Sequence, residues 1–300
     1  MQHHIGARLR QYLLLVRLPN AFTAPSNVLA GYFAATPPAE ASGAHLAALM
    51  VSSGLLYVAG IALNDYFDIE TDRRERPSRP LPSGSVPKKH AMAIALAAMT
   101  AANAIALLAA GPVGLAISLA LTAMIIAYDY RLKHTAAGPF AMGGSRFLNV
   151  ILGTSPAISA ALLAGAGVQL EAAVFAAASL FAYVVAITLL SKKEVGGERP
   201  GPLPSLMVFA AIAAIAAIGL PILRWEFLIP LSVFAAVMIV TFRQHLADPP
   251  SVQKAVRNMV ISIIILDSVF VSGTAGLPYG LATLLFIAPA VVLAKKLYVT

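Results

Sequence analysis

Residues 64–84 read NDYFDIETDRRERPSRPLPSG, a cluster of acids and arginines placed where a long apolar segment ends. Only 11% of the 300 residues are Asp, Glu, Lys or Arg, so this stretch departs strongly from the rest of the chain. Charged side chains at the edge of an apolar segment usually mark a functional site. We therefore expect the fold to be organised around a polar site at the end of this segment.

The chain around this stretch is too apolar for a soluble domain, because 59% of its side chains are hydrophobic. Apolar segments of about 18 to 22 residues, each able to cross a hydrocarbon core of about 30 Å as a helix, recur along the whole length. They are residues 21–38, 45–67, 89–110, 112–130, 139–164, 170–190, 203–221, 225–243, 255–275 and 278–295. We predict an all-α, polytopic membrane bundle of nine or ten transmembrane helices.

Lys and Arg residues concentrate in every second connection between these spans, and Arg224 is the exception on the other side. This bias supports an even number of spans, with the N-terminus and the basic connections in the cytoplasm. The same bias explains the net charge of +8 without nucleic acid as a partner. Because the basic connections are also the long polar ones, we expect a polar cap on the cytoplasmic side.

One membrane domain is predicted over residues 1–300. It comprises an interfacial N-terminal segment (1–19), a first polar loop (64–89), a second polar loop (191–204) and a possible extra C-terminal helix (278–295). The absence of cysteine excludes thiolate metal sites and disulfides.

Asn64, Asp68 and Asp72 lie four residues apart, so on a helix they share one face. Amide and carboxylate oxygens are the hard ligands that suit Mg²⁺, which commonly also binds substrate phosphate. The spacing therefore predicts a Mg²⁺ site at the end of the second span.

Arg73, Arg76 and Arg79 follow immediately, and guanidinium groups match phosphate oxygens in a bidentate manner. The loop is thus suited to a metal-bound diphosphate. The alternative is a solvated loop whose acids and arginines pair with one another. The ordered spacing, which runs back into the apolar span, argues against that alternative.

The pattern NDxxDxxxD followed by RPxRPLPSG resembles the first Asp-rich motif of the UbiA superfamily of intramembrane prenyltransferases. The resemblance extends over most of the chain in the order of its spans. It implies a helical membrane bundle in which two Asp-rich motifs on the cytoplasmic side bind Mg²⁺ and the diphosphate of an isoprenoid donor.

The resemblance also implies roles for residues outside the carboxylate motif. Arg17 with Asn20, and Asp65, become candidates for binding the substrate. In YDYRLK, residues 128–133, Lys133 is expected to contact phosphate and Tyr128 to face the reacting carbon.

Arg146 and Asn149 lie three apart on the fifth span, so they share a face, and an arginine there needs a partner or a ligand. Asp267, alone in the ninth span, is a candidate partner, although a structural hydrogen bond between helices is the favoured role. Tyr183, with Tyr128 and Tyr130, is a candidate for shielding an allylic cation.

The second motif departs from the family pattern, because residues 191–200 read SKKEVGGERP. Glu194 and Glu198 are spaced to share a helical face and become candidate metal ligands, whereas the Gly-Gly pair between them disfavours a continuous helix. Lys193 adds a positive charge suited to phosphate.

The predicted function is Mg²⁺-dependent transfer of a prenyl group, from an isoprenyl diphosphate to a lipophilic acceptor of aromatic or quinone-like type, within the membrane. Two alternatives remain: a non-catalytic carrier of a prenylated or diphosphate-bearing molecule, and a glycosyl-type transfer to a polyprenyl phosphate. Membrane lipid is an expected partner, and no oligomeric state follows from the sequence.

Overall fold

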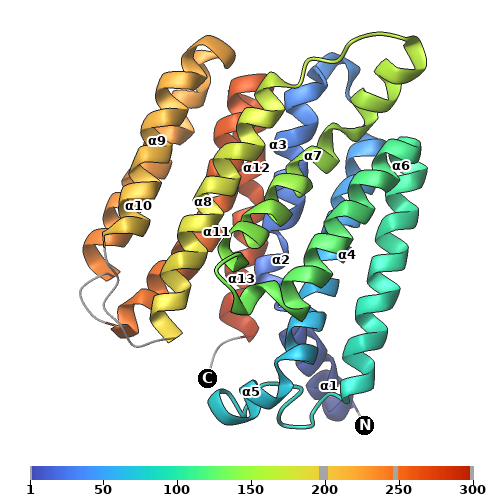
Figure 1. The fold of residues 1–300 in the computed structure, drawn as a ribbon, viewed down its shortest axis with the longest axis vertical. Helices are drawn as coiled ribbons and strands as arrows, with labels where there is room; N and C mark the ends of the chain where they lie inside the picture. The colour runs from blue at the N-terminus through green and yellow to red at the C-terminus, as the bar shows by residue number, and fades with distance from the viewer. Residues whose placement is uncertain (1, 196–201, 246–248, 298–300) are drawn as a thin grey trace.

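A computed structural model describes residues 2–195, 202–245 and 249–297, and this part of the chain contains helices and turns but no strand. Most helices run along the long axis of one bundle (Figure 1). The long ones are α3 (Thr23–Ala35), α4 (Gly43–Phe67), α6 (Lys88–Tyr130), α7 (Gly138–Ala164), α8 (Glu171–Val195), α9 (Leu203–Ile222), α10 (Leu228–His245), α11 (Pro249–Ala275) and α13 (Ile287–Leu297). The other helices are α1 (Gln2–Leu15), α2 (Leu18–Ala21), α5 (Ile69–Glu75) and α12 (Leu277–Thr283). Four 3₁₀ turns are also described: η1 (Pro38–Glu40), η2 (Leu132–His134), η3 (Trp225–Phe227) and η4 (Leu284–Phe286). The all-α prediction is confirmed.

Within the described residues, eight helical segments are long and apolar enough to cross a membrane. The last of them, Leu277–Leu297, joins α12, η4 and α13 and coincides with the extra C-terminal helix predicted from the sequence. The first predicted span, 21–38, contains α3, which has only 13 residues. The chain is therefore a multi-pass membrane protein.

Helix α6 is a hairpin of two spans. Its 43 residues would extend about 64 Å as one helix, twice the hydrocarbon thickness. The helical geometry breaks at Ala110 and at Gly111, whose φ of 61° favours glycine, and Pro112 follows. Asn103 Nδ2 then reaches Thr122 Oγ1 at 3.2 Å across the break, so the two halves run side by side as predicted (Figure 1).

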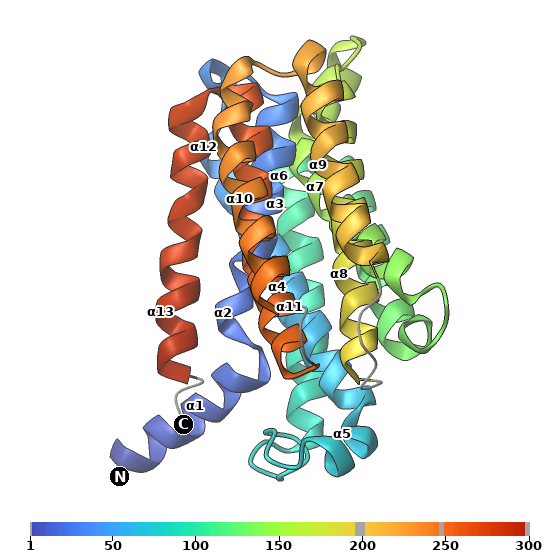
Figure 2. The same cartoon turned by 90° about the vertical axis from the view of Figure 1, so that its left-hand side faces the viewer.

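The first predicted polar loop lies at one end of the bundle, together with α1, α5 and the C-terminal ends of α8 and α13 (Figures 1 and 2). Helix α1 runs obliquely beneath α13 there, and Arg10 Nη2 donates a hydrogen bond to the Leu297 carbonyl at 3.0 Å. The N-terminal segment is thereby tied to the C-terminal helix.

Helices α3 and α7 approach so closely that only glycine fits at their crossing. A Cβ atom at Gly31 would overlap the backbone of Val150, and one at Gly153 would overlap the backbone of Val28 and Tyr32. Small residues at such crossings let helix backbones pack where no hydrophobic effect drives association. The crossing positions polar residues of α3 against those of α7.

We predict that Gly153→Ala destabilises the bundle by about 1 to 3 kcal/mol, because the added methyl forces α3 away from α7. Thermal unfolding in a mild detergent measures the change. Gly54→Ala in α4 is the matched control, since its Cβ would make only ordinary contact with Pro25. Equal midpoints for the two variants would contradict the close crossing.

Candidate active site

The candidate site begins where α4 ends. Asp68 has φ −88° and ψ 5°, and it caps both α4 and the short helix α5, which turns away from the bundle axis (Figure 2). The predicted continuous helix from Asn64 through Asp72 is therefore interrupted at Asp68. Four-residue backbone hydrogen bonds persist on either side, from Asp68 N–H to Asn64 O at 3.0 Å and from Asp72 N–H to Asp68 O at 2.8 Å.

The proline-rich loop after α5 is anchored by apolar side chains. Leu81 and Val86 are buried in a small cluster with Leu15 of α1 and Ile69 of α5. The Val86 N–H also donates to the carbonyl of Pro80 at 3.0 Å. These contacts hold the loop, and with it Arg79, over the end of α4.

A chain of ion pairs links four predicted residues. Arg17 Nη2 lies 2.7 Å from Asp65 Oδ1, and Arg79 Nη1 lies 3.7 Å from the same oxygen. Arg79 Nη1 also donates to both carboxylate oxygens of Asp72, at 2.9 and 2.7 Å. Asp65 and Asp72 are each only 3% exposed, so these contacts neutralise buried carboxylates.

A second ion pair joins the two polar segments of the first half of the chain. Lys133 Nζ, in η2, lies 2.6 Å from Asp68 Oδ1. The ammonium group is buried, yet it makes no hydrogen bond of good geometry with the described residues. The ammonium group therefore lies inside the site, with the Asp68 carboxylate as its ion-pair partner.

The last turn of α6 contributes a carboxylate that the sequence reading missed. Asp129 is 3% exposed, and its Oδ1 accepts a hydrogen bond from Asn64 Nδ2 at 3.1 Å. The available signal was its position, since it is the one acidic residue in α6. The neighbouring Tyr128 is half-buried and interacts electrostatically with Asp129, Asp68 and Arg17.

Arg17 adopts an unusual backbone conformation at the junction between α1 and α2. Its φ of 44° and ψ of 49° lie in the left-handed region, which non-glycine residues rarely occupy. The backbone of Asn20 serves the same junction, since its N–H donates to the Arg17 carbonyl and its carbonyl accepts from Thr23 Oγ1. The strain is maintained where the Arg17 side chain reaches Asp65.

Four predicted residues lie away from this centre. Arg73 pairs with Glu70 at 2.8 Å on the exposed face of α5, and Arg76 is exposed at the end of that helix. Tyr130 is 68% exposed and packs on Phe67. Tyr183, 1% exposed, donates its hydroxyl hydrogen bond to the Met259 carbonyl at 2.9 Å in the core between α8 and α11. An apolar span cannot reveal whether its tyrosine faces a core or a substrate.

Arg146 and Asn149 form a separate, deeper network with α3. Arg146 Nη1 donates to Asn27 Oδ1 at 3.0 Å, and Asn149 Nδ2 donates to the Ala24 carbonyl at 2.9 Å. Asp267 accepts from Asn27 Nδ2 at 2.7 Å. The predicted link between Arg146 and Asp267 therefore exists, but the Asn27 amide bridges it.

The second polar loop is described only in part. Lys193 and Glu194 belong to the last turn of α8, of which only the backbone is described, and Glu198 lies outside the described residues. Lys192 Nζ donates to the Thr135 carbonyl at 2.8 Å. This contact brings the end of α8 beside the loop that follows Lys133.

The donor atoms fit a Mg²⁺–diphosphate pair, although they are arranged as ion pairs. Carboxylate and amide oxygens from α4, α5 and α6 are hard ligands, and Arg17, Arg79 and Lys133 are suited to phosphate. In the part of the chain that the structure describes, no three acidic or histidine side chains converge as a metal site. The acids instead contact the bases, so a metal and a phosphate would take over both sets of partners.

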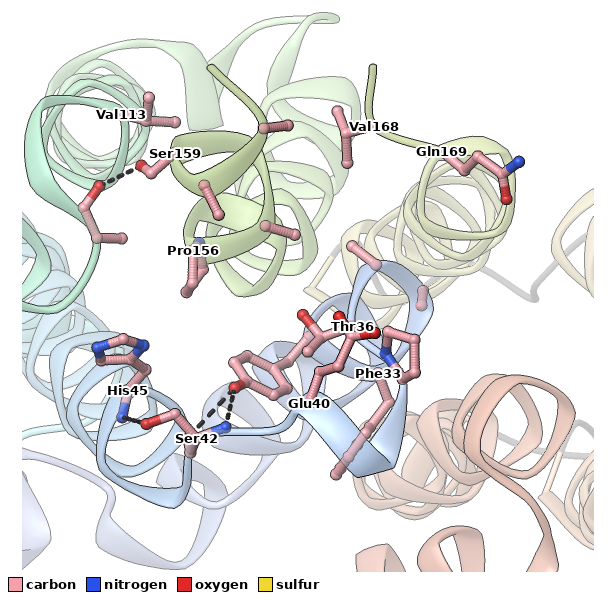
Figure 3. A pocket seen from close by; sticks show the side chains of 18 of the residues that line it. Phe33, Thr36, Glu40, Ser42, His45, Val113, Pro156, Ser159, Val168 and Gln169 are labelled. Carbon is pink, nitrogen blue, oxygen red and sulfur yellow. Dashed lines mark hydrogen bonds between the residues drawn. The ribbon is translucent and has the colours of Figure 1, made fainter. Parts of the chain in front are cut away.

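A cavity of about 1310 Å³ lies at the opposite end of the bundle. The connections at that end line it (Figure 3), and several of its polar groups bond one another: Ser42 N–H donates to Tyr32 Oη at 2.8 Å, and Ser159 Oγ to the Ala110 carbonyl at 2.6 Å. Since Asp68 and Asp72 do not line this cavity, we place the candidate chemistry at the acid-rich end.

Comparison with known proteins points to one family. A model of the UbiA prenyltransferase family matches residues 25–159, which include the first polar loop, Lys133, Arg146 and Asn149. The digeranylgeranylglyceryl phosphate synthase of Ignicoccus hospitalis is 36% identical over 132 residues, which are 43% of this chain and 41% of the relative. The chain thus spans about two fifths of that relative's length.

A longer match reaches the second half of the chain. The digeranylgeranylglyceryl phosphate synthase of Methanoregula boonei is 29% identical over 224 residues, covering 65% of this chain and 78% of the relative. Among solved structures, a UbiA homologue from Archaeoglobus fulgidus bound to GPP and Mg²⁺ superposes with a TM-score of 0.61 at 17% identity, covering 91% of this chain and 99% of that one. This likeness establishes the fold.

We predict that Arg79→Ala lowers stability by about 3 kcal/mol, because it leaves the buried carboxylate of Asp72 without a partner. Adding Asp72→Asn should recover most of that loss. Arg73→Ala, which breaks an exposed ion pair, should change stability by less than about 1 kcal/mol. Thermal unfolding midpoints in detergent test this order, and equal losses for the two arginine variants would refute it.

Proposed function

We propose that the chain belongs to the UbiA prenyltransferase family, whose model matches residues 25–159, and that it catalyses Mg²⁺-dependent transfer of a prenyl group from an isoprenyl diphosphate to a lipophilic acceptor in the membrane. The observation that carries the proposal is the convergence of paired acids and bases from the junction of α1 and α2, α4, α5, the loop after α5, and η2 at one end of an apolar bundle.

The acids would hold the metal. We propose Asn64, Asp68 and Asp72 as ligands, with Glu194 and Glu198 as candidates from the second polar loop. When bound, Mg²⁺ would neutralise the negative charge that develops on the departing diphosphate.

The bases would bind the diphosphate and stabilise its departure. Lys133 contributes a buried ammonium group that contacts Asp68, and Arg17 and Arg79 contribute planar guanidinium groups that contact Asp65 and Asp72. Preorganised positive charge of this kind favours the transition state in which the allylic C–O bond breaks. Tyr128, which is half-buried and interacts electrostatically with Asp68, is proposed to face the allylic carbon that remains.

Arg146 and Asn149 are proposed to line the deeper part of the substrate path. The Arg146 guanidinium lies over the ring of Tyr57 at 5.7 Å, and both polar side chains are held by α3. A fixed cation inside an apolar bundle favours a polar group on the substrate.

The acceptor is best sought among lipids. The two curated relatives are, by their name, digeranylgeranylglyceryl phosphate synthases, so a prenylated glyceryl phosphate is the first acceptor to test. The aromatic or quinone-like acceptor expected from the sequence gains no support from these relatives. It is the second acceptor to test. We propose that the acid-rich end faces the cytoplasm, in accord with the positive-inside bias.

Purified protein in lipid nanodiscs should release diphosphate from allylic isoprenyl diphosphates only with Mg²⁺ and an acceptor. Asp68→Ala and Lys133→Ala should each lower turnover by about 100-fold or more. Arg73→Ala, on the exposed face of α5, is the matched control and should retain turnover. Donor binding without diphosphate release would instead identify a carrier.

Mg²⁺ and inorganic pyrophosphate should bind cooperatively. Mg²⁺ alone would bind the carboxylates and leave the arginine and lysine side chains without partners, and pyrophosphate alone would bind those basic side chains and leave the carboxylates without partners. When both ligands bind, every charged side chain gains a new partner. We expect each to tighten the other by about 5- to 150-fold, measured by calorimetry with the second ligand absent or saturating. Independent binding of the two ligands would contradict this exchange of partners.

A further inference from the structure

We propose that Asp129 is a positioning residue, which turns the carbonyl oxygen of Asn64 toward the cation site and so sets its affinity for Mg²⁺. The inference rests on the proposed function and deepens it. It arises from the carboxylate of α6 that the family motif does not include and that the structure brings against the motif from a second helix.

The direction of the Asn64 amide follows from hydrogen-bond chemistry. In the structure Asn64 presents its NH₂ to Asp129, with Nδ2 3.1 Å from Oδ1, and the carboxylate oxygen accepts this hydrogen bond. The carbonyl oxygen of the same planar group then points away from Asp129. That oxygen is the atom of Asn64 able to bind a hard cation.

Burial makes this orientation strong. Asp129 is 3% exposed, at the end of an apolar hairpin in which it is the one acidic residue. A buried carboxylate needs a donor, and a charge-assisted hydrogen bond is about twice as strong as a neutral one. The amide therefore has a large penalty for flipping its NH₂ toward the cation.

Asp129 also has charged neighbours that belong to the site. Asp68, Lys133 and Arg17 interact electrostatically with it. Lys133 follows one turn later, and its ammonium group contacts Asp68 at 2.6 Å. Asp129 therefore lies among the charged groups of the site, and its hydrogen bond acts on Asn64.

The test measures Mg²⁺ affinity directly. Wild-type protein and variants in nanodiscs are titrated with Mg²⁺ at saturating inorganic pyrophosphate, by calorimetry, with Mn²⁺ binding followed by electron paramagnetic resonance as a second readout. Asp129→Ala should weaken the metal by about 10- to 100-fold, the usual effect of removing a group that orients a ligand. Asp129→Asn keeps an acceptor for Asn64 and should lose about 10-fold or less.

A double-mutant cycle separates positioning from direct ligation. If Asp129 acts through Asn64, the double variant Asn64→Ala/Asp129→Ala should bind metal about as weakly as Asn64→Ala alone. The positioning role would be overturned if the losses of Mg²⁺ affinity in the two single variants multiplied in the double variant. It would also be overturned if Asp129→Asn lost as much Mg²⁺ affinity as Asp129→Ala.

Asp267→Asn is the matched control, because Asp267 is also a buried carboxylate that accepts from an asparagine amide, but in α11. It should leave Mg²⁺ affinity within about twofold. If Asp129→Ala fails to fold, Asp129→Asn and the cycle built on it decide the question. Wild-type protein that binds no Mg²⁺ with pyrophosphate would defeat the proposed function and this inference together; wild-type binding that Asp129→Ala leaves unchanged would defeat the inference alone.

Discussion

A buried carboxylate needs a hydrogen-bond donor or a cation beside it, and this requirement organises the polar end of the bundle. Asp65, Asp68 and Asp72 lie within eight residues of one another, yet their partners come from three other places: the junction of α1 and α2, the proline-rich loop, and η2. Each ion pair therefore ties down a different segment. A buried pair adds little to stability by itself, but breaking it is costly, so the pairs specify how the segments are arranged.

The same constraint connects the structure to its chemistry. Acids and bases that neutralise one another in the free protein are the groups that a divalent cation and a diphosphate would separate. The proposed reaction would thus reuse the contacts that hold this end of the bundle together.

Local sequence information was sufficient for the spans and for the first polar loop, because hydropathy, Gly-Pro breaks and motif spacing are properties of neighbouring residues. It could not show that the helix would break at Asp68, since the four-residue periodicity continues through the break. Nor could it pair Arg17 with Asp65 or Asn64 with Asp129, because those contacts depend on how distant helices pack. Asp129 was missed for a related reason: its hexapeptide was read for tyrosine and lysine, and the burial that gives the acid its significance is a tertiary property.

The hairpin turn at Gly111 has a consequence for membrane insertion. A chain that failed to reverse there would deliver every later connection to the opposite side of the bilayer, so Lys133 and Asp68 would be separated by the full hydrocarbon thickness. Their contact at 2.6 Å therefore reports on the parity of the preceding crossings. In this protein the turn at Gly111, with its positive φ, keeps the segments that carry Asp68 and Lys133 on the same side of the membrane.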